Sequence, residues 1–321
     1  MTMTRQTIRC STVRSAINVA AGATVLAMAC FTAAQAAEHT DCDRACLHGI
    51  ADVYFDALAK HDASKLPVTT DVKFTENGQQ LKLGEGLWKT AGTATYRMEI
   101  FDPEHGDAGI QAVLHENNDL MLLMLRLKVI HKKISEVETI VARKNVSSAY
   151  IWAPETLKEP SHNFTLSIRP AEQNSRLELM AASDAYWRAF ETNGTPDYHP
   201  APFLPDANRF ENGLQTTNRK IGTFGPYTAA EQFDRGLFKG GAIQERRYPV
   251  VDTERGVVLS IVRFGRQDSL PADQGVGSSP PSTARPLVAE FFAVKSGKIQ
   301  EIQVVMTTMP GNSPTGWPTS W

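Results

Sequence analysis

The 321-residue sequence predicts an α+β fold made of two tandem copies of one domain. Short motifs recur in the same order: Glu76-Asn77-Gly78 returns as Glu211-Asn212-Gly213, and Gly86-Leu87-Trp88-Lys89 returns as Gly236-Leu237-Phe238-Lys239. The separation grows from 135 to 150 positions, as expected if the second copy carries insertions. Each copy places a helical pattern before a series of strand-like segments, and this order is typical of α+β domains.

The first 36 residues have the pattern of an export signal. Arg5, Arg9 and Arg14 precede an alanine-rich apolar run, and Ala34-Gln35-Ala36 has the small-x-small form of a signal-peptidase site. Polar residues interrupt the run, which disfavours a membrane span of about 20 strongly apolar residues. We therefore expect a periplasmic or secreted protein with no stable membrane span once the signal is removed.

The mature chain is expected to contain two domains joined by a linker. The first domain covers residues 37–143, the proline-containing linker 144–175, the second domain 176–308 and a C-terminal tail 309–321. Because an exposed tryptophan is costly, the tail with Trp317 is expected to dock on the body of the protein or on another subunit. A homodimer is one assembly that fits this expectation.

Each copy is predicted to begin with an amphipathic helix, because apolar residues recur with a period near 3.6 from Cys42 to Lys60 and from Arg176 to Phe190. A short strand, an Asn-Gly turn and a short helix follow. Four further strands, separated by turn residues, complete each copy as an antiparallel meander. These strands are expected at residues 96–101, 109–116, 120–131 and 134–143, and at 243–251, 256–264, 286–294 and 299–307.

Only Cys42 and Cys46 remain after removal of the signal, and they lie at the expected start of the first helix. In an oxidising compartment the two thiols can form a disulfide. In an ideal helix the Cβ atoms of residues four apart lie about 5–6 Å from each other, whereas a disulfide needs about 3.8 Å. The sequence leaves two alternatives: a local disulfide with an unwound first turn, or two free thiols.

The charge balance disfavours a nucleic-acid partner. The chain has 33 Lys and Arg residues against 35 Asp and Glu residues, so it lacks the basic excess that binds phosphate backbones. A small-molecule ligand is the partner we expect.

The order of elements resembles the nuclear transport factor 2-like superfamily, which includes the SnoaL-like and ketosteroid isomerase-like proteins. Cys-Asp-Arg-Ala-Cys at 42–46, Phe-Thr-Glu-Asn-Gly at 74–78 and Leu-Gly-Glu-Gly-Leu-Trp at 83–88 are similar to motifs of an exported bacterial and fungal family with two such domains and no assigned function. The resemblance implies two cone-shaped domains, each with N-terminal helices packed on a strongly curved antiparallel sheet around a pocket. Binding proteins and enzymes share that pocket, so the fold does not choose between them.

Two glutamates and two arginines recur in both copies and are the candidate catalytic residues. Glu76 and Glu211 lie beside the Asn-Gly turns, where a carboxylate can act as a general base if burial raises its pKa. Arg97 and Arg247 lie in the following strands, and the guanidinium group suits a carboxylate partner. The structural alternative is that each glutamate accepts local hydrogen bonds and pairs with the arginine of its own copy.

Five further residues are candidates for lining a pocket. Tyr54 and Tyr186 lie mid-helix on the side expected to face the sheet, Trp88 and Phe238 occupy equal places in a recurring motif, and His199 lies in a loop. In the ketosteroid isomerase branch a helical tyrosine and a protonated acid stabilise an oxyanion. No motif places the acids of that branch in this sequence, and a buried aromatic ring with a bonded hydroxyl is the structural alternative.

Two functions remain open from the sequence. The first is a cofactor-independent lyase or isomerase that moves a proton on a small apolar or aromatic molecule, with a glutamate as base and an arginine or tyrosine stabilising negative charge. The second is a non-catalytic ligand-binding or scaffolding protein. The sequence has no nucleophile elbow, P-loop, dinucleotide fingerprint or metal-binding histidine motif, so neither a cofactor nor a metal is expected.

Overall fold

The computed structural model describes residues 41–144, 151–265, 284–310 and 313–318. All of them belong to one compact unit, residues 38–321. The predicted export signal and Trp321 lie outside the described residues. Among the described helices, none combines the length and the apolar character that a membrane crossing requires.

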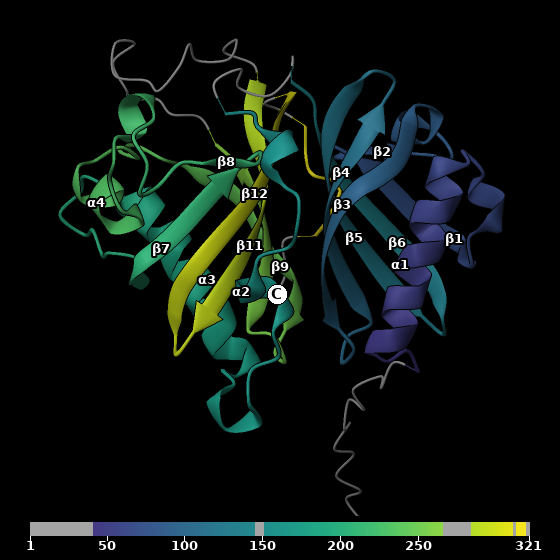
Figure 1. Ribbon diagram of the computed structural model, residues 1–321, viewed down its shortest axis with the longest axis horizontal. Helices are drawn as coiled ribbons and strands as arrows, with labels where there is room; N and C mark the ends of the chain where they lie inside the picture. The colour runs from purple at the N-terminus through teal and green to yellow at the C-terminus, as the bar shows by residue number, and fades with distance from the viewer. Residues whose placement is uncertain (1–40, 145–150, 266–283, 311–312, 319–321) are drawn as a thin grey trace, which may run out of the picture. The chain divides into compact units, whose positions relative to one another are not determined.

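The unit contains a first half, residues 41–142, and a second half, residues 176–310, each with a helix followed by a six-stranded sheet (Figure 1). The first half contains α1 (Arg44–Ala59), β1 (Val68–Glu76), β2 (Gln79–Leu81), β3 (Ala91–Asp102), β4 (Asp107–Glu116), β5 (Asp119–Ile130) and β6 (Lys133–Ala142). The second half contains α3 (Arg176–Thr192), β7 (Phe203–Glu211), β8 (Leu214–Gln215), α4 (Ala229–Asp234), β9 (Ile243–Asp252), β10 (Val257–Phe264), β11 (Ala284–Lys295) and β12 (Lys298–Pro310). The short helix α2 (His162–Thr165) lies in the connection between them.

The predicted α+β class is confirmed, and two details of the sheets are corrected. The strand orders are β2-β1-β6-β5-β4-β3 and β8-β7-β12-β11-β10-β9, so both halves have one topology. The sheets are mixed, because β1 runs parallel to β6 and β7 runs parallel to β12. Such a pairing joins strands far apart in sequence, which leaves no local signal. The strong curl implied by the family resemblance is also absent (Figure 1).

The start of α1 accommodates a disulfide between Cys42 and Cys46, whose Cα atoms lie 5.2 Å apart. Cys42 precedes the first helical residue, and Asp43 caps the helix by accepting a hydrogen bond from the N–H of Cys46 at 2.9 Å. Because Cys42 lies outside the helix, its side chain is free of the helical spacing. The disulfide alternative therefore holds, but the first turn is not unwound, because α1 begins only at Arg44.

The recurring Asn-Gly turns have a structural explanation in both halves. Asn77 and Asn212 adopt positive φ angles of 49° and 46°, and the following glycines adopt 78° and 83°, as a tight hairpin requires. Each asparagine side chain also bonds the backbone of the parallel neighbour. Asn77 accepts from the N–H of Val141 at 2.7 Å, and Asn212 accepts from the N–H of Met306 at 2.9 Å. The asparagines thus hold the first hairpin of each sheet against its last strand.

Among the described residues, buried apolar side chains form three cores. The first lies between α1 and the first sheet, and the third lies between α3 and the second sheet. The second core joins the opposite faces of the two sheets and includes Met98 and Leu122 from one half and Leu259 and Phe291 from the other. Each sheet is therefore covered by its own helix on one face and by the other sheet on the other face.

Two aspartates at strand ends join the halves reciprocally. Asp102 accepts a hydrogen bond from the N–H of Val251, and Asp252 accepts one from the N–H of Phe101. Arg176 at the start of α3 pairs with Asp102, and Arg44 at the start of α1 pairs with Asp252 at 2.6 Å. The β3–β4 and β9–β10 hairpins thus connect one half to the other.

The C-terminal tail packs against the first half. This agrees with the expectation that the tail docks on the body of the protein. Trp317 is 8% exposed, and its indole N–H donates to Oγ1 of Thr75 at 3.0 Å. The guanidinium group of Arg126 lies 4.7 Å and the Lys73 ammonium 3.9 Å from the indole ring, distances at which cation–π attraction operates.

We predict that Asp252→Ala lowers the free energy of unfolding by roughly 3 kcal/mol, because it leaves a part-buried arginine and a buried backbone N–H without their partner. Urea unfolding measures the change. Glu254→Ala is the matched control: it removes a second partner of Arg44, but its side chain is 46% exposed, so the loss should stay within about 1 kcal/mol. Equal losses in the two variants would contradict the proposed importance of the buried aspartate.

Candidate functional site

The helix-facing side of the second sheet carries a row of residues, three of which are polar. Glu211 lies opposite Val304, Val304 lies opposite Glu290, and Glu290 lies opposite Ser260, so the four residues form one row over β7, β12, β11 and β10. Directly paired residues on neighbouring strands point to the same face. The Ser260 hydroxyl accepts a hydrogen bond from the indole N–H of Trp187 on α3 at 2.8 Å, which identifies that face as the helix side.

Arg209 joins this row from β7, two residues before Glu211. Its side chain is fully buried, and its Nε lies 3.5 Å from Oε1 of Glu211. Its Nη2 donates to Oε1 of Gln232 on α4 at 2.6 Å, and the ring centre of Phe238 lies 5.0 Å from its Cζ. Its Nε also donates to Oγ1 of Thr216 at 3.3 Å, so the arginine is held by a carboxylate, an amide, a hydroxyl and an aromatic ring.

Tyr186 reaches the same region from α3, which begins at a capping box formed by Ser175 and Glu178. The rings of Phe203, Phe233 and Phe292 lie 6.1, 5.5 and 5.2 Å from the tyrosine ring, so an apolar wall surrounds it. Burial raises the pKa of Tyr186 well above its usual range, and the nearby charge of Glu290 adds to the increase. The hydroxyl therefore remains protonated and able to donate.

Glu290 is 3% exposed. Burial raises its pKa well above 4.5, the negative charge of Glu211 raises it further, and Arg209 only partly opposes these effects. A raised pKa favours the protonated form of a carboxyl group, which can donate a hydrogen bond. Glu290 lies beside Glu211, whose carboxylate is paired with Arg209.

Several atoms of this group make no hydrogen bond within the described part of the chain. They are Nη1 of Arg209, Oε2 of Glu211 and Oε2 of Glu290, all buried. Buried polar atoms are nearly always satisfied in native proteins, and exceptions call for a water, a ligand or a functional role. We name Tyr186, Arg209, Glu211 and Glu290 the carboxyl cluster.

The first half serves as an internal comparison. At the same register positions it has Phe74 in place of Arg209, Leu125 in place of Glu290 and Ile110 in place of Ser260. That half folds with apolar residues at all three places, so the fold does not require the charged groups. A reason other than folding is needed for their presence in the second half.

Glu76 and Glu211, equivalent in sequence, have different surroundings. Oε2 of Glu76 accepts from the N–H of Leu87 at 2.6 Å and so caps the turn at residues 86–89, and Oε1 lies 3.7 Å from Arg143. Burial raises the pKa of Glu76, and the N–H of Leu87 opposes that rise. Gly86 packs so closely that an added Cβ would lie 2.1 Å from Oε2 of Glu76. These contacts are the local hydrogen bonds that the structural alternative predicted.

Neither candidate arginine pairs with the candidate glutamate of its own copy, Glu76 or Glu211. Arg97 pairs with Asp52 at 2.8 Å and also with Glu99, whereas Arg247 reaches the first sheet and bonds Glu138 through Nη1 at 3.1 Å. The structural alternative predicted an ion pair between Glu76 and Arg97 and between Glu211 and Arg247. Both pairings are wrong, because each arginine has other partners.

A β-bulge explains why the two arginines face opposite directions. Arg97 lies opposite Ala112, and Arg246 lies opposite Val262, so Arg246 occupies the register position of Arg97. An extra residue in β9 near Pro249 causes the shift, and a shift of one residue turns every following side chain to the other face. Arg246 accordingly pairs with Asp184 on α3, as Arg97 pairs with its helix aspartate.

The other predicted pocket residues are dispersed. Tyr54 and Trp88 are buried together in the first core with ring centres 5.2 Å apart, and neither Oη nor Nε1 has a hydrogen-bond partner among the described residues. Phe238 lies beside the carboxyl cluster through its contact with Arg209. His199 is exposed in its loop and is not part of this group.

Arg209 and Glu290 were not among the residues predicted from the sequence, because neither of them recurs in the first half. A signal was nevertheless present. Glu290 interrupts an otherwise apolar strand from Leu287 to Val294, and a charged residue at a buried strand position is rare unless it is paired or functional.

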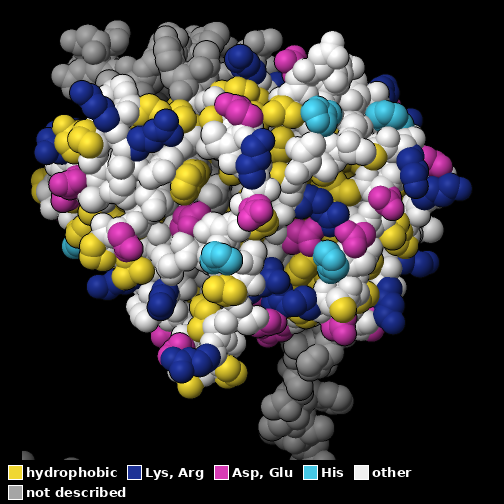
Figure 2. Space-filling view, viewed as in Figure 1, with side chains coloured by type: hydrophobic (Ala, Val, Ile, Leu, Met, Phe, Trp, Pro, Cys, Tyr) yellow, Lys and Arg dark blue, Asp and Glu magenta, His cyan; other side chains and the backbone are white. Residues whose placement is uncertain are grey.

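A groove and a cleft in the described part of the chain lie outside the carboxyl cluster. A groove of about 850 Å³ is lined by the start of α1, by β3 and by Arg255 of the second half. A cleft of about 340 Å³ lies between residues 156–161, the β7–β8 hairpin and β12. On the face shown in Figure 2, basic and acidic side chains are interspersed without a broad patch of one sign.

Comparison with protein families identifies the chain. The model of a family described as a domain of unknown function (DUF8021) matches residues 40–141 and again residues 172–306. The protein belongs to this family. The double match confirms the predicted tandem arrangement, and the resemblance to a two-domain family without an assigned function is also confirmed. A comparison with curated proteins found no match.

Solved structures are similar to single halves of this family member. A protein of unknown function with a cystatin-like fold from Methylobium petroleophilum is 13% identical, with a TM-score of 0.29, over 32% of this chain and 79% of that one. A steroid delta-isomerase from Pseudomonas aeruginosa is 11% identical, with a TM-score of 0.26, over 33% and 85%. A de novo designed protein with a curved β-sheet is 12% identical, with a TM-score of 0.27, over 32% and 89%.

We predict that Glu290→Gln removes a pH-dependent loss of stability. The pKa of Glu290 is raised in the folded protein. Its contribution to the free energy of unfolding is therefore fully present below about pH 4.5, the usual pKa of a glutamate, and is lost as the pH rises. The stability of the wild type relative to the variant should fall by about 1.4 kcal/mol per pH unit above that value, until the folded pKa is reached.

Thermal unfolding of both proteins from pH 4 to 9 measures this difference. Glu290→Leu introduces the residue of the first half and should give the same flattened profile, because it also removes the titrating group. A constant difference between wild type and Glu290→Gln over the whole range would mean that Glu290 is ionised when buried.

Proposed function

We propose that the second half is a cofactor-independent acid–base catalyst, an isomerase or lyase that moves a proton on a small, largely apolar carbonyl compound. The observation that carries the proposal is the carboxyl cluster, in which buried oxygens of two glutamates and one arginine nitrogen lack partners. A polar ligand group placed among them would satisfy all three. The same positions in the first half are apolar, which supports a role in function rather than in folding.

Glu211 is the proposed general base. One of its oxygens lies 3.5 Å from the arginine of the cluster, and the other is free to accept a proton from carbon. It lies at the end of β7 with its side chain 14% exposed, so it is the cluster member nearest to solvent. A positioned base of this kind accelerates proton transfer by about 10²–10⁴-fold.

Tyr186 and Glu290 are the proposed donors to the oxygen that gains negative charge. Burial raises the pKa of each side chain and so favours the protonated form, which can donate a hydrogen bond. Donors fixed in an apolar surrounding stabilise a developing oxyanion more strongly than water does. The proton removed by Glu211 returns to a different carbon in an isomerase, or assists departure of a leaving group in a lyase, so the reaction needs no oxidant or reductant.

The apolar wall around the cluster defines the substrate class. Phe203, Phe233 and Phe292 surround the tyrosine, and both cavities described above lie outside this core. Their location also favours the alternative, a non-catalytic ligand-binding or scaffolding protein whose buried cluster holds water. Native mass spectrometry of gently purified protein addresses that alternative, because a retained small molecule without turnover would support binding alone.

We predict that the protein accelerates isomerisation of 3-cyclohexenone, a small β,γ-unsaturated ketone, to its conjugated isomer. Glu211→Gln should slow the reaction by about 100-fold or more, because the amide cannot accept the proton. Ultraviolet absorbance of the conjugated product measures the rate, and deuterium uptake from D2O measures proton removal.

Glu76→Gln is the matched control. Glu76 has the same place in the first half, but both its oxygens have partners, so the rate should be unchanged. Equal losses in the two variants, or a wild-type rate no higher than that of buffer, would refute a base at Glu211 for this substrate class.

We further propose that the mature protein is periplasmic or secreted. The predicted signal in residues 1–36 and the disulfide between Cys42 and Cys46 support this location, because such bonds persist in oxidising compartments. The molecular mass and fractionation of the protein from its native cells test it. A chain retaining residues 1–36 in the cytoplasm would contradict the proposal.

A further inference from the structure

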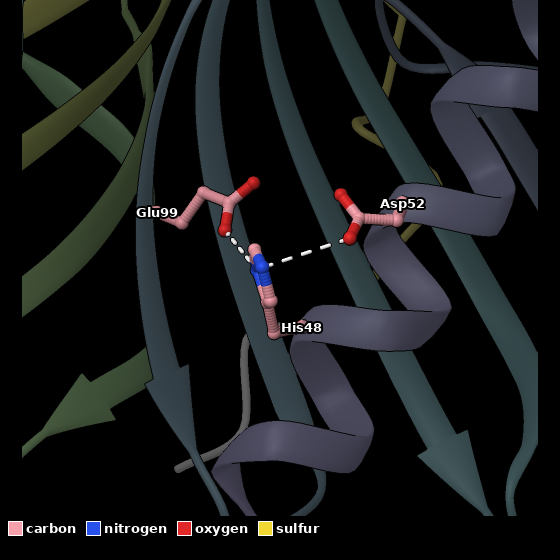
Figure 3. Close-up of side chains that lie close together, drawn as sticks. All are labelled: His48, Asp52 and Glu99. Carbon is pink, nitrogen blue, oxygen red and sulfur yellow. Dashed lines mark hydrogen bonds and ion pairs between the residues drawn. The ribbon is translucent and has the colours of Figure 1, made fainter.

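A second group of titratable side chains lies on the first half, outside the carboxyl cluster (Figure 3). His48 and Asp52 lie one turn apart on α1, and Glu99 lies on β3. His48 Nδ1 is 2.7 Å from Oε2 of Glu99, and its Nε2 is 3.6 Å from Oδ2 of Asp52. One ligand atom from each residue lies within 4.8 Å of the other two.

Arg97 fixes the outer oxygens of both carboxylates. Its Nη1 bonds Oδ1 of Asp52 at 2.8 Å, and its Nη2 bonds Oε1 of Glu99. The remaining oxygens, Oδ2 and Oε2, are the two that face His48. Metal-binding carboxylates usually have such an outer hydrogen-bond donor, which orients the inner oxygen toward the ion.

The charge of this group suits a divalent cation. Two carboxylates are opposed by one guanidinium group, so a net negative charge remains when the histidine is neutral. A neutral imidazole with two carboxylate oxygens matches the ligands of Zn²⁺ and similar transition metals, whereas Mg²⁺ and Ca²⁺ prefer oxygen ligands alone.

The second half shows that folding does not require the trio. It retains the pair of helix aspartate and strand arginine as Asp184 and Arg246, 2.7 Å apart. Met180 occupies the place of His48, and the hydroxyl of Tyr248, at 2.9 Å from Asp184, takes the place of a second carboxylate. Two of the three ligands are therefore specific to the first half.

We propose that His48, Asp52 and Glu99 bind a divalent transition-metal ion of the Zn²⁺ type. Three protein ligands leave a coordination position open to water or a ligand, as in catalytic zinc sites. His48 and Glu99 also line the groove of about 850 Å³, so the open position faces a space in which a small molecule can bind. Arg255 from the second half fixes the backbone of Glu99 by donating to its carbonyl oxygen at 2.8 Å.

Isothermal titration calorimetry of the purified protein with ZnCl2 near neutral pH, after dialysis against a chelator, tests the proposal. We expect one equivalent of Zn²⁺ per chain, tighter binding than for MgCl2, and a Zn²⁺-dependent rise in the melting temperature. His48→Ala should weaken binding by more than about 10-fold and abolish the rise. The His48 side chain is 54% exposed, so this variant should fold. A circular dichroism spectrum equal to that of the wild type checks this.

His105→Ala is the matched control. His105 belongs to another trio, with Asp102 and Glu104, but its Nδ1 lies 2.8 Å from Nη2 of Arg176, so a cationic group already faces the nitrogen that would bind the metal. Zn²⁺ binding of this variant should equal that of the wild type. The proposal is overturned if the wild type binds no Zn²⁺, if His48→Ala binds it unchanged, or if only His105→Ala loses it.

Discussion

The rest of the structure depends on the packing of the two sheets against each other. Asp102 and Asp252 accept backbone hydrogen bonds from the opposite half, and the first arginine of each helix reaches across to the aspartate of the other half. Since the partner of each group lies in the other copy, neither half alone satisfies its buried charges. Leaving a buried charge without its partner costs about 3–5 kcal/mol, so the halves are held as one unit.

This packing decides where a functional site can lie. One face of each sheet is occupied by the other sheet, so chemistry in the cores is limited to the face under α1 or α3. The carboxyl cluster occupies that face in the second half. The groove beside His48 forms where α1 and β3 meet Arg255, a residue of the other half, and therefore exists only in the docked arrangement.

The duplication separates what the fold needs from what it tolerates. Glu-Asn-Gly recurs because the asparagine joins the first hairpin to the last strand in both halves. Four residues of the two candidate sites depart from the repeat: Arg209 and Glu290 in the second half, and His48 and Glu99 in the first. The equivalent positions of the other half hold uncharged residues, so the shared fold does not need these side chains. A recurring residue in this chain is thus more often structural, and a non-recurring charged residue at a buried or grooved position is the better candidate for function.

The sequence by itself determined the α+β class, the two copies, the order of helix and strands, and the tight Asn-Gly turns, because these follow from local periodicity and from backbone preferences of a few adjacent residues. Only the tertiary structure decided the parallel pairing of β1 with β6, the face of Arg247 and the partners of Glu76 and Glu211. Pro249 illustrates the reason: one extra residue in β9 reverses which arginine faces the helix, and strand register depends on contacts between residues distant in sequence.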